Sequence, residues 1–238
     1  MKIALIGYGK MGRAVEEIAL EKGHEIVLII DVNNQADLNA SNLSKAYVAI
    51  EFTGPNTAEK NIRTCIDAGI PVISGSTGWI EKLPGLEQYC LNENGSFLYA
   101  SNFSIGVNIF FELNRKLATM MSAHSNYDVN IEEIHHTQKK DAPSGTAITL
   151  AEDILKELPF KNKWVNDKSP GKDELNIASK RIDPAPGTHK VHYSSPIDDI
   201  EIIHTAHNRK GFAMGAVLAA EYIHDKKGVF TMKDVLSI

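Results

Sequence analysis

The chain has 238 residues, of which 43% are hydrophobic and 23% charged, and its formal net charge is −5. This length predicts one large or two small domains, and the composition is that of an ordinary globular protein. The charge provides no basic field for nucleic acid, and no apolar run is as long as a membrane span. Because the chain opens in a strand-like run instead of a signal peptide, we expect a cytoplasmic protein with no nucleic-acid or membrane partner.

The first strand-like run, residues 2–6, leads into Gly7-Tyr-Gly-Lys-Met-Gly12 and then into a helical pattern that continues to about residue 22. A strand, a glycine-rich turn and a helix in this order are the context that a dinucleotide-binding turn requires. We expect Gly7 to permit the tight turn, Gly9 to let a pyrophosphate approach the backbone, and Gly12 to let the helix pack closely. The candidate cofactor contacts of this turn are Gly7, Tyr8, Gly9, Lys10, Met11 and Gly12.

The next strand-like run, residues 25–31, ends in Asp31, about twenty residues beyond the glycines. A carboxylate at this place can accept hydrogen bonds from the ribose hydroxyls of the adenosine, which slightly favours NADH over NADPH. No Arg or Lys lies in residues 32–34 to bind a 2′-phosphate, although Lys10 or Arg13 could compensate in part. An Asp at a strand end is also a common turn former, and it is the preceding glycines that favour ribose binding.

Strand and helix patterns continue to alternate as far as residue 103, with strands expected at 46–53, 71–77 and 96–100. Such alternation predicts an α/β fold, here a Rossmann-type doubly wound parallel sheet. In that architecture ligands bind outside the carboxyl ends of the strands. The polar and small residues at those ends extend the predicted cofactor site to Thr53, Gly75, Ser76, Thr77, Ala100, Ser101, Asn102 and Phe103.

The pattern changes after residue 104 and predicts a second, α+β domain with a mixed sheet. We therefore expect a dinucleotide-binding domain over 1–103, with a C-terminal return over 213–238, and a substrate-binding and oligomerisation domain over 104–212. The closing helix is expected to pack back onto the first domain, and Thr231 to cap a last turn of helix. The expected elements are a helix at 108–121, a strand near 129–134, a helix at 147–158, a loop at 160–174, strands at 176–182, 188–194 and 199–206, and a helix at 212–224.

Metal binding is not expected. His189, His192, His204 and His207 alternate with apolar residues, but each pair is three residues apart, which puts its members on opposite faces of a strand. No Cys or acidic cluster joins them in the sequence. Cys65 and Cys90 also lack metal-ligand spacing, so they predict free thiols in a reducing compartment.

The stretch from Glu133 to Thr146, Glu-Ile-His-His-Thr-Gln-Lys-Lys-Asp-Ala-Pro-Ser-Gly-Thr, concentrates proton donors and cations. His135 and His136 fall at the end of the strand-like run, where they can serve one site only if the chain leaves the strand about there. Lys139 and Lys140 add cations, and a histidine can pass a proton near neutral pH. A histidine pair at a strand end can also be structural or merely exposed, and it is the company of these residues that favours a catalytic site.

The second half of this stretch predicts a helix start with Ser144 as the N-cap. The first amides of the helix, around Gly145 and Thr146, have no intrahelical partners and lie at the positive end of the helix dipole. The absence of a side chain at Gly145 would let an anion come close. These features predict a site for a carboxylate.

With these residues assembled, the chain resembles the 4-hydroxy-tetrahydrodipicolinate reductase (dihydrodipicolinate reductase) family from end to end. The specific part is residues 133–146, which fit the family pattern E-x-H-H-x-x-K-x-D-A-P-S-G-T throughout. Residues 52–55, 75–78 and 100–108 and the closing run from residue 230 resemble its other signatures. The resemblance implies a two-domain reductase that uses NADH or NADPH on a small dicarboxylate, and a homotetramer built through the second-domain sheets.

The resemblance also implies roles for single residues. His135 resembles the family's catalytic histidine, Lys139 its proton donor and His136 a substrate ligand. Gly145 and Thr146 resemble its carboxylate-binding amides, and Arg181 the arginine that begins its R-x-G-x-x-x-G-x-H segment. In this chain, however, that segment has Asp183 and prolines where the family usually has glycine and apolar residues. The glycine turn is also shorter than in many members, and Ser76 replaces a threonine.

The function expected from residues and resemblance together is reduction of 4-hydroxy-tetrahydrodipicolinate with NADH or NADPH in diaminopimelate and lysine biosynthesis. One alternative is another two-domain dehydrogenase of a small carboxylated substrate, which would lack the full motif of residues 133–146. The other is a non-catalytic nicotinamide redox sensor, which would bind the cofactor and turn nothing over. A sensor needs no proton donors beside an anion site.

Overall fold

The computed structural model describes residues 1–166, 171–208 and 210–238, and it divides the chain into two compact units. The first unit consists of Met1–Ile105 and Lys210–Ile238, and the second of Gly106–Arg209. Both boundaries lie within a few residues of the expected ones, which were 103/104 and 212/213. The roles expected for the two domains, dinucleotide binding and substrate binding, stay predictions.

The first unit is built on a six-stranded sheet in which every pair of neighbouring strands is parallel. This confirms the predicted parallel sheet. The last strand, β11, was not predicted, because three residues are too few for an alternating pattern to be recognised. In the order β11-β5-β4-β3-β1-β2, the strands are β1 (Lys2–Ile6), β2 (Glu25–Ile30), β3 (Val48–Glu51), β4 (Val72–Ser74), β5 (Ser96–Tyr99) and β11 (Gly228–Phe230).

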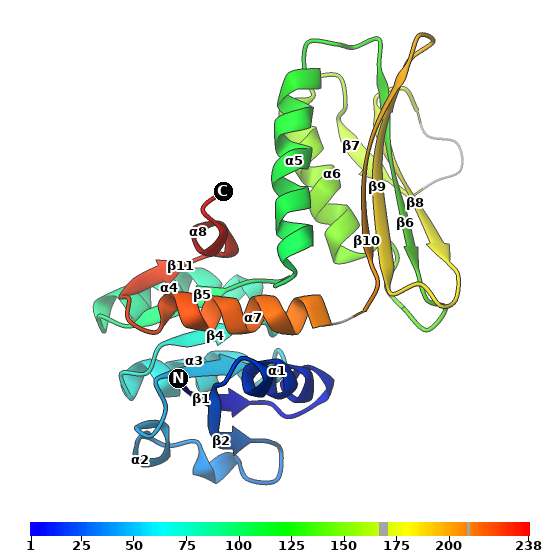
Figure 1. Cartoon of the computed structure of the whole chain (residues 1–238). Helices are drawn as coiled ribbons and strands as arrows, with labels where there is room; N and C mark the ends of the chain where they lie inside the picture. Colours follow the sequence, from blue (N-terminus) through cyan, green and yellow to red (C-terminus); the bar gives the residue numbers. More distant parts are fainter. Residues whose placement is uncertain (167–170, 209) are drawn as a thin grey trace. The chain divides into compact units, whose positions relative to one another are not determined.

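Helices cover both faces of this sheet, as a doubly wound fold requires (Figure 1). Ile3 and Leu5 pack in a core with α1 (Lys10–Glu21) and α7 (Lys210–Ile223). Ala4 and Ile6, which alternate with them along β1, pack in the core of the opposite face. That face carries α2 (Ala40–Leu43), α3 (Ala58–Asp67) and α4 (Leu83–Asn92), and two short 3-10 turns occupy Gln35–Asp37 and Ile80–Lys82.

The closing helix α7 belongs to the first unit, as expected from its alanine-rich face. Ala213, Ala216 and Ala220 are fully buried, and small side chains let α7 lie close to α1 and to the sheet. The chain ends in α8 (Met232–Leu236), which Thr231 begins through a capping box with Asp234. No helix of the described residues is long and apolar enough to cross a membrane.

The second unit has a five-stranded sheet in the order β10-β9-β6-β8-β7. Strand β6 runs antiparallel to β9 and parallel to β8, so the sheet is mixed, as predicted. Two helices cover one of its faces (Figure 1). The elements are α5 (Ile105–Met121), β6 (Asp128–His135), α6 (Gly145–Glu157), β7 (Lys163–Val165), β8 (Glu174–Arg181), β9 (Gly187–Ser194) and β10 (Asp199–Ala206).

The loop predicted over residues 160–174 is wrong in part, because Lys163–Val165 form strand β7. The segment is polar in sequence, but it pairs with β8, and Trp164 packs against the core of the unit. Pairing with a neighbouring strand thus overrides a weak local pattern. Residues 167–170 of the predicted loop lie outside the described residues.

Strand β6 positions the candidate catalytic residues. After the exposed Asp128, its residues are alternately buried and half-buried, so that Val129, Ile131, Glu133 and His135 all face the core side. The period of two that buries the two apolar residues therefore also buries a carboxylate and an imidazole. Both are held by packing before any ligand arrives.

Candidate active site

The predicted cofactor site of the first unit overlaps in part with a cleft of about 400 Å³ at the carboxyl ends of β1, β2 and β3. Five of the predicted cofactor residues line it, while Lys10, Met11 and Gly12 follow at the start of α1. The other predicted rim residues, 75–77 and 100–103, are not among the lining residues. Those that line the cleft are Gly7, Tyr8, Gly9, Asp31 and Thr53.

The glycine turn has the geometry that a dinucleotide needs. Gly7 has a φ of +96°, and a Cβ there would lie 2.1 Å from the carbonyl oxygen of Phe52. A Cβ at Gly12 would lie 2.1 Å from the carbonyl oxygen of Gly7, so the helix can approach the turn only without it. A Cβ at Gly9 would meet nothing within 4 Å, although Gly9 lines the cleft. The missing side chain leaves room for a bound group, so the cleft fits a dinucleotide.

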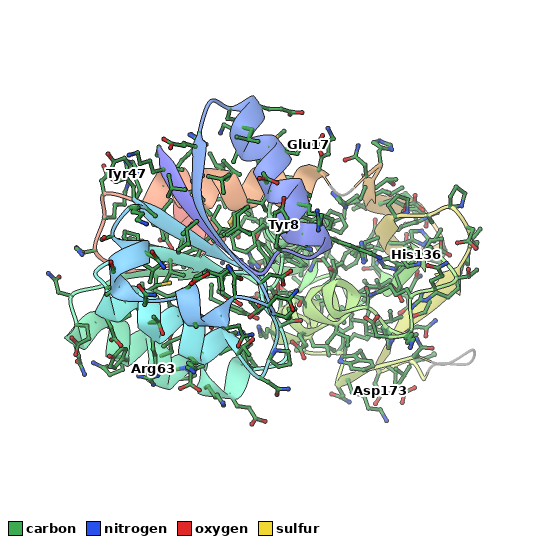
Figure 2. The ribbon with its side chains drawn as sticks, turned by 90° about the horizontal axis from the view of Figure 1, so that it is seen from below. Tyr8, Glu17, Tyr47, Arg63, His136 and Asp173 are labelled. Atoms are coloured by element: carbon green, nitrogen blue, oxygen red, sulfur yellow. The ribbon has the colours of Figure 1, made fainter. Side chains whose placement is uncertain are left out.

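Asp31 follows β2 and is held by its backbone, whose amide donates to the side chain of Asn34 over 2.7 Å. Across the cleft, the Tyr8 hydroxyl donates to Glu16, and the Arg13 guanidinium lies 4.5 Å from the centre of the Tyr8 ring. Figure 2 shows Tyr8 at the turn that precedes α1. Asp31 and Tyr8 both line the cleft, and the Arg13 cation lies against the Tyr8 ring.

Glu51, at the end of β3, was missed by the sequence reasoning. Its fully buried carboxylate accepts hydrogen bonds from the amide and hydroxyl of Thr53 and from the hydroxyls of Ser74 and Ser76. It therefore ties together the loops that follow β3 and β4. Gly75 is required beside it, because a Cβ would lie 2.0 Å from the ring of Phe52. An acid at the end of an otherwise apolar strand was the available signal.

In the second unit, β6 ends at His135, and His136 is the first residue beyond it. The geometric condition for both histidines to serve one site is thus met. His135 is buried, whereas His136 is half-buried and lines a cavity of about 360 Å³ together with Gln138, Asp183 and Pro184. Figure 2 shows His136 in the second unit.

Lys139 is held by Asp141, with 2.8 Å from its Nζ to each carboxylate oxygen. Burial opposes ionisation of Asp141, but the hydrogen bond from Lys139 lowers the pKa of its carboxyl. The Asp therefore stays anionic and keeps the ammonium in one place. Lys140, by contrast, is exposed.

The start of α6 confirms the predicted cap. The Ser144 hydroxyl accepts a hydrogen bond from the amide of Ala147 over 3.2 Å, and the amide of Ile148 donates to the Ser144 carbonyl. The amides of Gly145 and Thr146 are left over at the positive end of a thirteen-residue helix. A Cβ at Gly145 would meet nothing within 4 Å, so packing does not require glycine there. The absence of a side chain at Gly145 keeps the approach to these amides open.

The Arg181 guanidinium donates its hydrogen bonds to groups of the second unit. One guanidinium nitrogen donates to Glu133 over 3.0 Å and to the Asp141 carbonyl over 2.6 Å, and the others contact the carbonyls of Lys139 and Lys180. In this arrangement Arg181 braces the loop that carries Lys139. Its expected contact with a substrate remains a prediction.

Asp183, which departs from the family pattern, also braces this loop. Its carboxylate accepts hydrogen bonds from the amide of Thr137 over 3.1 Å and from the Thr137 hydroxyl over 2.6 Å, and these bonds lower the pKa of Asp183. The Thr137–Asp183 pair thus joins the loop after β6 to the loop after β8. A glycine at position 183 could not do this.

The expectation that no Cys or acidic cluster joins the histidines of the strands is wrong in part, because acids lie beside His189 and His192. Glu133 of β6 is paired in register with His189 of β9. A carboxylate oxygen of Glu133 and one ring nitrogen each of His135 and His189 all lie within 4.8 Å of one another. The spacing of histidines within one strand cannot reveal this contact, because the acid comes from the neighbouring strand. The Oε2 atom of Glu133 lies 2.6 Å from Nδ1 of His135.

His189 has the features of a buried neutral imidazole. Burial, together with the neighbouring His135, lowers its pKa to about 3. Its Nε2 atom lies 3.1 Å from the Ser144 hydroxyl, and its ring packs edge-on against that of His135 with the centres 5.1 Å apart. His189 therefore links the helix cap to the candidate catalytic histidine.

Comparison with known proteins covers both units. Residues 1–103 match the family model described as dihydrodipicolinate reductase, N-terminus, and residues 106–236 match the one described as dihydrodipicolinate reductase, C-terminus. A 4-hydroxy-tetrahydrodipicolinate reductase from Christiangramia forsetii is 53% identical, over 100% of this chain and 98% of its own. One from Methanosarcina barkeri is 35% identical, over 99% of this chain and 89% of its own.

Solved structures show which part of this likeness is fold alone. A dipicolinate-bound dihydrodipicolinate reductase from Paenisporosarcina has a TM-score of 0.76 at 21% identity, with 97% of each chain covered. A DAP dehydrogenase from C. glutamicum has a TM-score of 0.55 at 15% identity, with 98% of this chain and 92% of that one covered. The architecture is therefore shared among several dehydrogenases, whereas the sequence matches distinguish between them. On these matches, which span the chain almost from end to end, the protein belongs to the dihydrodipicolinate reductase family.

Proposed function

We propose that this protein reduces 4-hydroxy-tetrahydrodipicolinate to tetrahydrodipicolinate with NADH or NADPH, in diaminopimelate and lysine biosynthesis. The observation that carries the proposal is the 53% identity, over the whole chain, to a relative named for this activity. The stretch 133–146, which supplies the candidate acid–base residues and the helix start, lies within that match. The protein is accordingly an oxidoreductase that depends on a nicotinamide cofactor.

The nucleotide is proposed to lie in the cleft of the first unit, with its pyrophosphate at Gly9 and the start of α1, and its ribose at Asp31. Reduced nicotinamide, when bound, supplies the hydride. The residues of this unit bind and orient it, and Glu51 braces the loop that carries Thr53. Asp31 favours NADH slightly, and Arg13 gives a 2′-phosphate some compensation.

The substrate is proposed to be held in the second unit through its carboxylates. The amides of Gly145 and Thr146 would bind one of them, and His136 would contact the substrate from the loop after β6. Lys139 is the proposed proton donor, kept in place by Asp141, and His135 is the second proposed catalytic residue. The roles of these residues, and that of Arg181 in substrate binding, are part of the proposal.

We also propose a homotetramer that assembles through the sheets of the second unit, and a location in the cytoplasm. Strand β10 supports the first idea, because it is an edge strand and carries the exposed Ile200 and Ile203. The two cysteines of the chain support the second, because both are buried and free. Light scattering of the purified protein would measure the oligomeric state.

The decisive test is the loss of reduced-nicotinamide absorbance with freshly generated 4-hydroxy-tetrahydrodipicolinate, measured with NADH and NADPH in parallel. We expect rapid oxidation that requires both the substrate and the protein. No oxidation with either cofactor, in spite of tight cofactor binding, would contradict the proposal. Oxidation of another carboxylated substrate would then support the dehydrogenase alternative, and the absence of any turnover would support the sensor.

A further inference from the structure

The buried carboxylate of Glu133 joins three parts of the candidate site. Its side chain is fully buried, and its Oε1 atom accepts hydrogen bonds from Arg181 of β8 over 3.0 Å and from the amide of Ser144 over 3.2 Å. Its Oε2 atom lies 2.6 Å from Nδ1 of His135. One carboxylate thus contacts the candidate acid–base histidine, the cap of α6 and the arginine that braces the loop.

The charge state of Glu133 follows from these contacts. Burial alone would raise the pKa of its carboxyl, but hydrogen bonds from His135, Ser144, Ser179 and Arg181 together hold it well below its usual range. The group is therefore an anion in the folded protein and can only accept hydrogen bonds.

An anion at this distance determines where His135 carries its proton. The two atoms are not aligned as a straight hydrogen bond, but both are buried and neither has another hydrogen-bond partner among the described residues. A carboxylate oxygen and an unprotonated ring nitrogen would repel each other at 2.6 Å, so a proton on His135 Nδ1 is the arrangement that satisfies both atoms. In the neutral imidazole the other nitrogen, Nε2, then has no proton of its own. Glu133 in this way selects one of the two tautomers.

A metal ion shared by Glu133, His135 and His189 accounts less well for the same cluster. Ligands of a tetrahedral ion with bonds of about 2.0–2.1 Å lie roughly 3.3 Å apart, which is longer than the 2.6 Å contact between Glu133 and His135. The Arg181 guanidinium, 3.0 Å from the same carboxylate, already supplies the positive charge. A proton between two partners fits these distances.

The ring of His135 is held on its other sides as well. A Cβ at Gly187 would lie 3.0 Å from His135 Nε2, so the ring packs directly on that backbone. His189 packs against it edge-on. The ring has little freedom to turn over, and its orientation is fixed by packing while its tautomer is fixed by charge.

We propose that Glu133 is a positioning residue for the reduction, which keeps the proton of His135 on Nδ1, reserves Nε2 for proton exchange, and anchors the Ser144 amide that begins α6. The proposal rests on the proposed function, since it gives His135 a part in the chemistry. It couples the acid–base histidine and the proposed carboxylate site through one buried charge. Glu133 acts through its neighbours and is not itself proposed to touch the substrate.

The first test is independent of activity. The nine histidines of the protein are labelled with ¹⁵N, and long-range ¹H–¹⁵N correlation spectra assign a tautomer to each neutral ring; the His135 signal is identified by its loss in His135→Gln. We expect a proton on Nδ1 of His135 in the unaltered protein. A proton on Nε2 instead, with Nδ1 bare, would overturn the proposal whether or not any variant folds.

The second test uses Glu133→Gln, whose amide oxygen can still accept hydrogen bonds from Arg181 and Ser144. The amide group would present N–H to Nδ1 of His135, so we expect the proton of the ring to move to Nε2. The kcat should fall by about a hundredfold or more, as expected when a catalytic histidine is held in the wrong tautomer, while the Kd for NADH is unchanged. The matched control is Glu132→Gln, a half-exposed neighbour that pairs with Lys180, which should keep both kcat and tautomer.

The outcomes separate this proposal from the proposed function. If the unaltered protein oxidises neither cofactor, the proposed function fails, while the spectra still decide the placement of the proton. If Glu133→Gln shifts the tautomer and keeps full kcat, the positioning role is overturned and the reductase stands. If it shifts the tautomer and loses kcat without losing cofactor affinity, the positioning role is supported.

Discussion

The cleft of the first unit is formed largely by backbone, whereas the candidate catalytic site of the second unit is formed by charged side chains that contact one another. At the cleft, Gly7, Gly9 and Gly12 decide the shape by having no side chain. Around Glu133, the arrangement of the site is decided by contacts of one buried carboxylate with Ser144, Arg181 and His135. At the cleft, a single substitution changes one contact with the ligand. In a network of buried charges, removal of one member leaves its partners without hydrogen bonds.

The largest effect is expected in the second unit, from Lys139→Ala. Loss of the proposed proton donor should lower kcat by about 10²–10⁴-fold and leave the Kd for NADH unchanged. Steady-state kinetics and cofactor titration measure the two quantities. The control is Lys140→Ala, which removes the exposed neighbouring ammonium and should keep kcat. Equal kcat for Lys139→Ala and the unaltered protein would remove Lys139 from the mechanism.

A smaller effect is expected in the cleft, from Asp31→Asn. This change removes the charge that repels a 2′-phosphate and weakens the acceptor for ribose hydroxyls. The ratio of kcat/KM for NADPH to that for NADH should rise about tenfold, the value of one charged hydrogen bond. Asp37→Asn, a nearby exposed carboxylate outside the cleft, should keep the ratio. An unchanged ratio in Asp31→Asn would mean that another group sets the preference.

Gly145→Ala tests whether the start of α6 is open for a ligand or for a structural reason. No atom lies within 4 Å of the added methyl group, so the melting temperature should be unchanged or slightly higher. The KM for substrate should rise by about two- to tenfold, as for one weakened hydrogen bond. Gly85→Ala, an equally open glycine of α4, should have the same small effect on the melting temperature and leave KM unchanged. A fall in stability with KM unchanged would assign Gly145 a structural role.

The smallest effect at neutral pH is expected for the titration of His189, which changes the stability of the folded protein. Its pKa is about 3 in the folded protein and near 6.5 when unfolded, so between these values the unfolded chain binds the additional proton. Stability should therefore be full above about pH 6.5 and should decrease as the pH falls toward 3. Glu133, whose pKa is lowered by folding, adds a loss in the same direction below about 4.5.

Melting temperatures of the unaltered protein and His189→Asn, measured from pH 7 to pH 4, test this explanation. The variant loses the hydrogen bond to Ser144 and should be less stable at pH 7, but its stability should depend less steeply on pH. Parallel pH profiles for the two proteins would show that the titration of His189 does not contribute.

The sequence by itself determined the features that repeat over short distances. The alternation of strands and helices predicted the parallel sheet, the order of serine and glycine predicted the start of α6, and residues 133–146 indicated the family. Such patterns depend on neighbours within a few residues along the chain, where side-chain direction follows from the period of the element. For the same reason the short strands β7 and β11 were not predicted.

Only the tertiary structure decided which of these residues meet. Glu133 reaches Arg181 across 48 residues, Ser144 reaches His189 across 45, and Thr137 reaches Asp183 across 46. These contacts depend on the order and register of β9, β6 and β8 and on the course of the loops beyond them, and no local pattern encodes either. A carboxylate on the core face of β6 is an anomaly in the sequence, and it becomes the centre of a site once the neighbouring strands are in place.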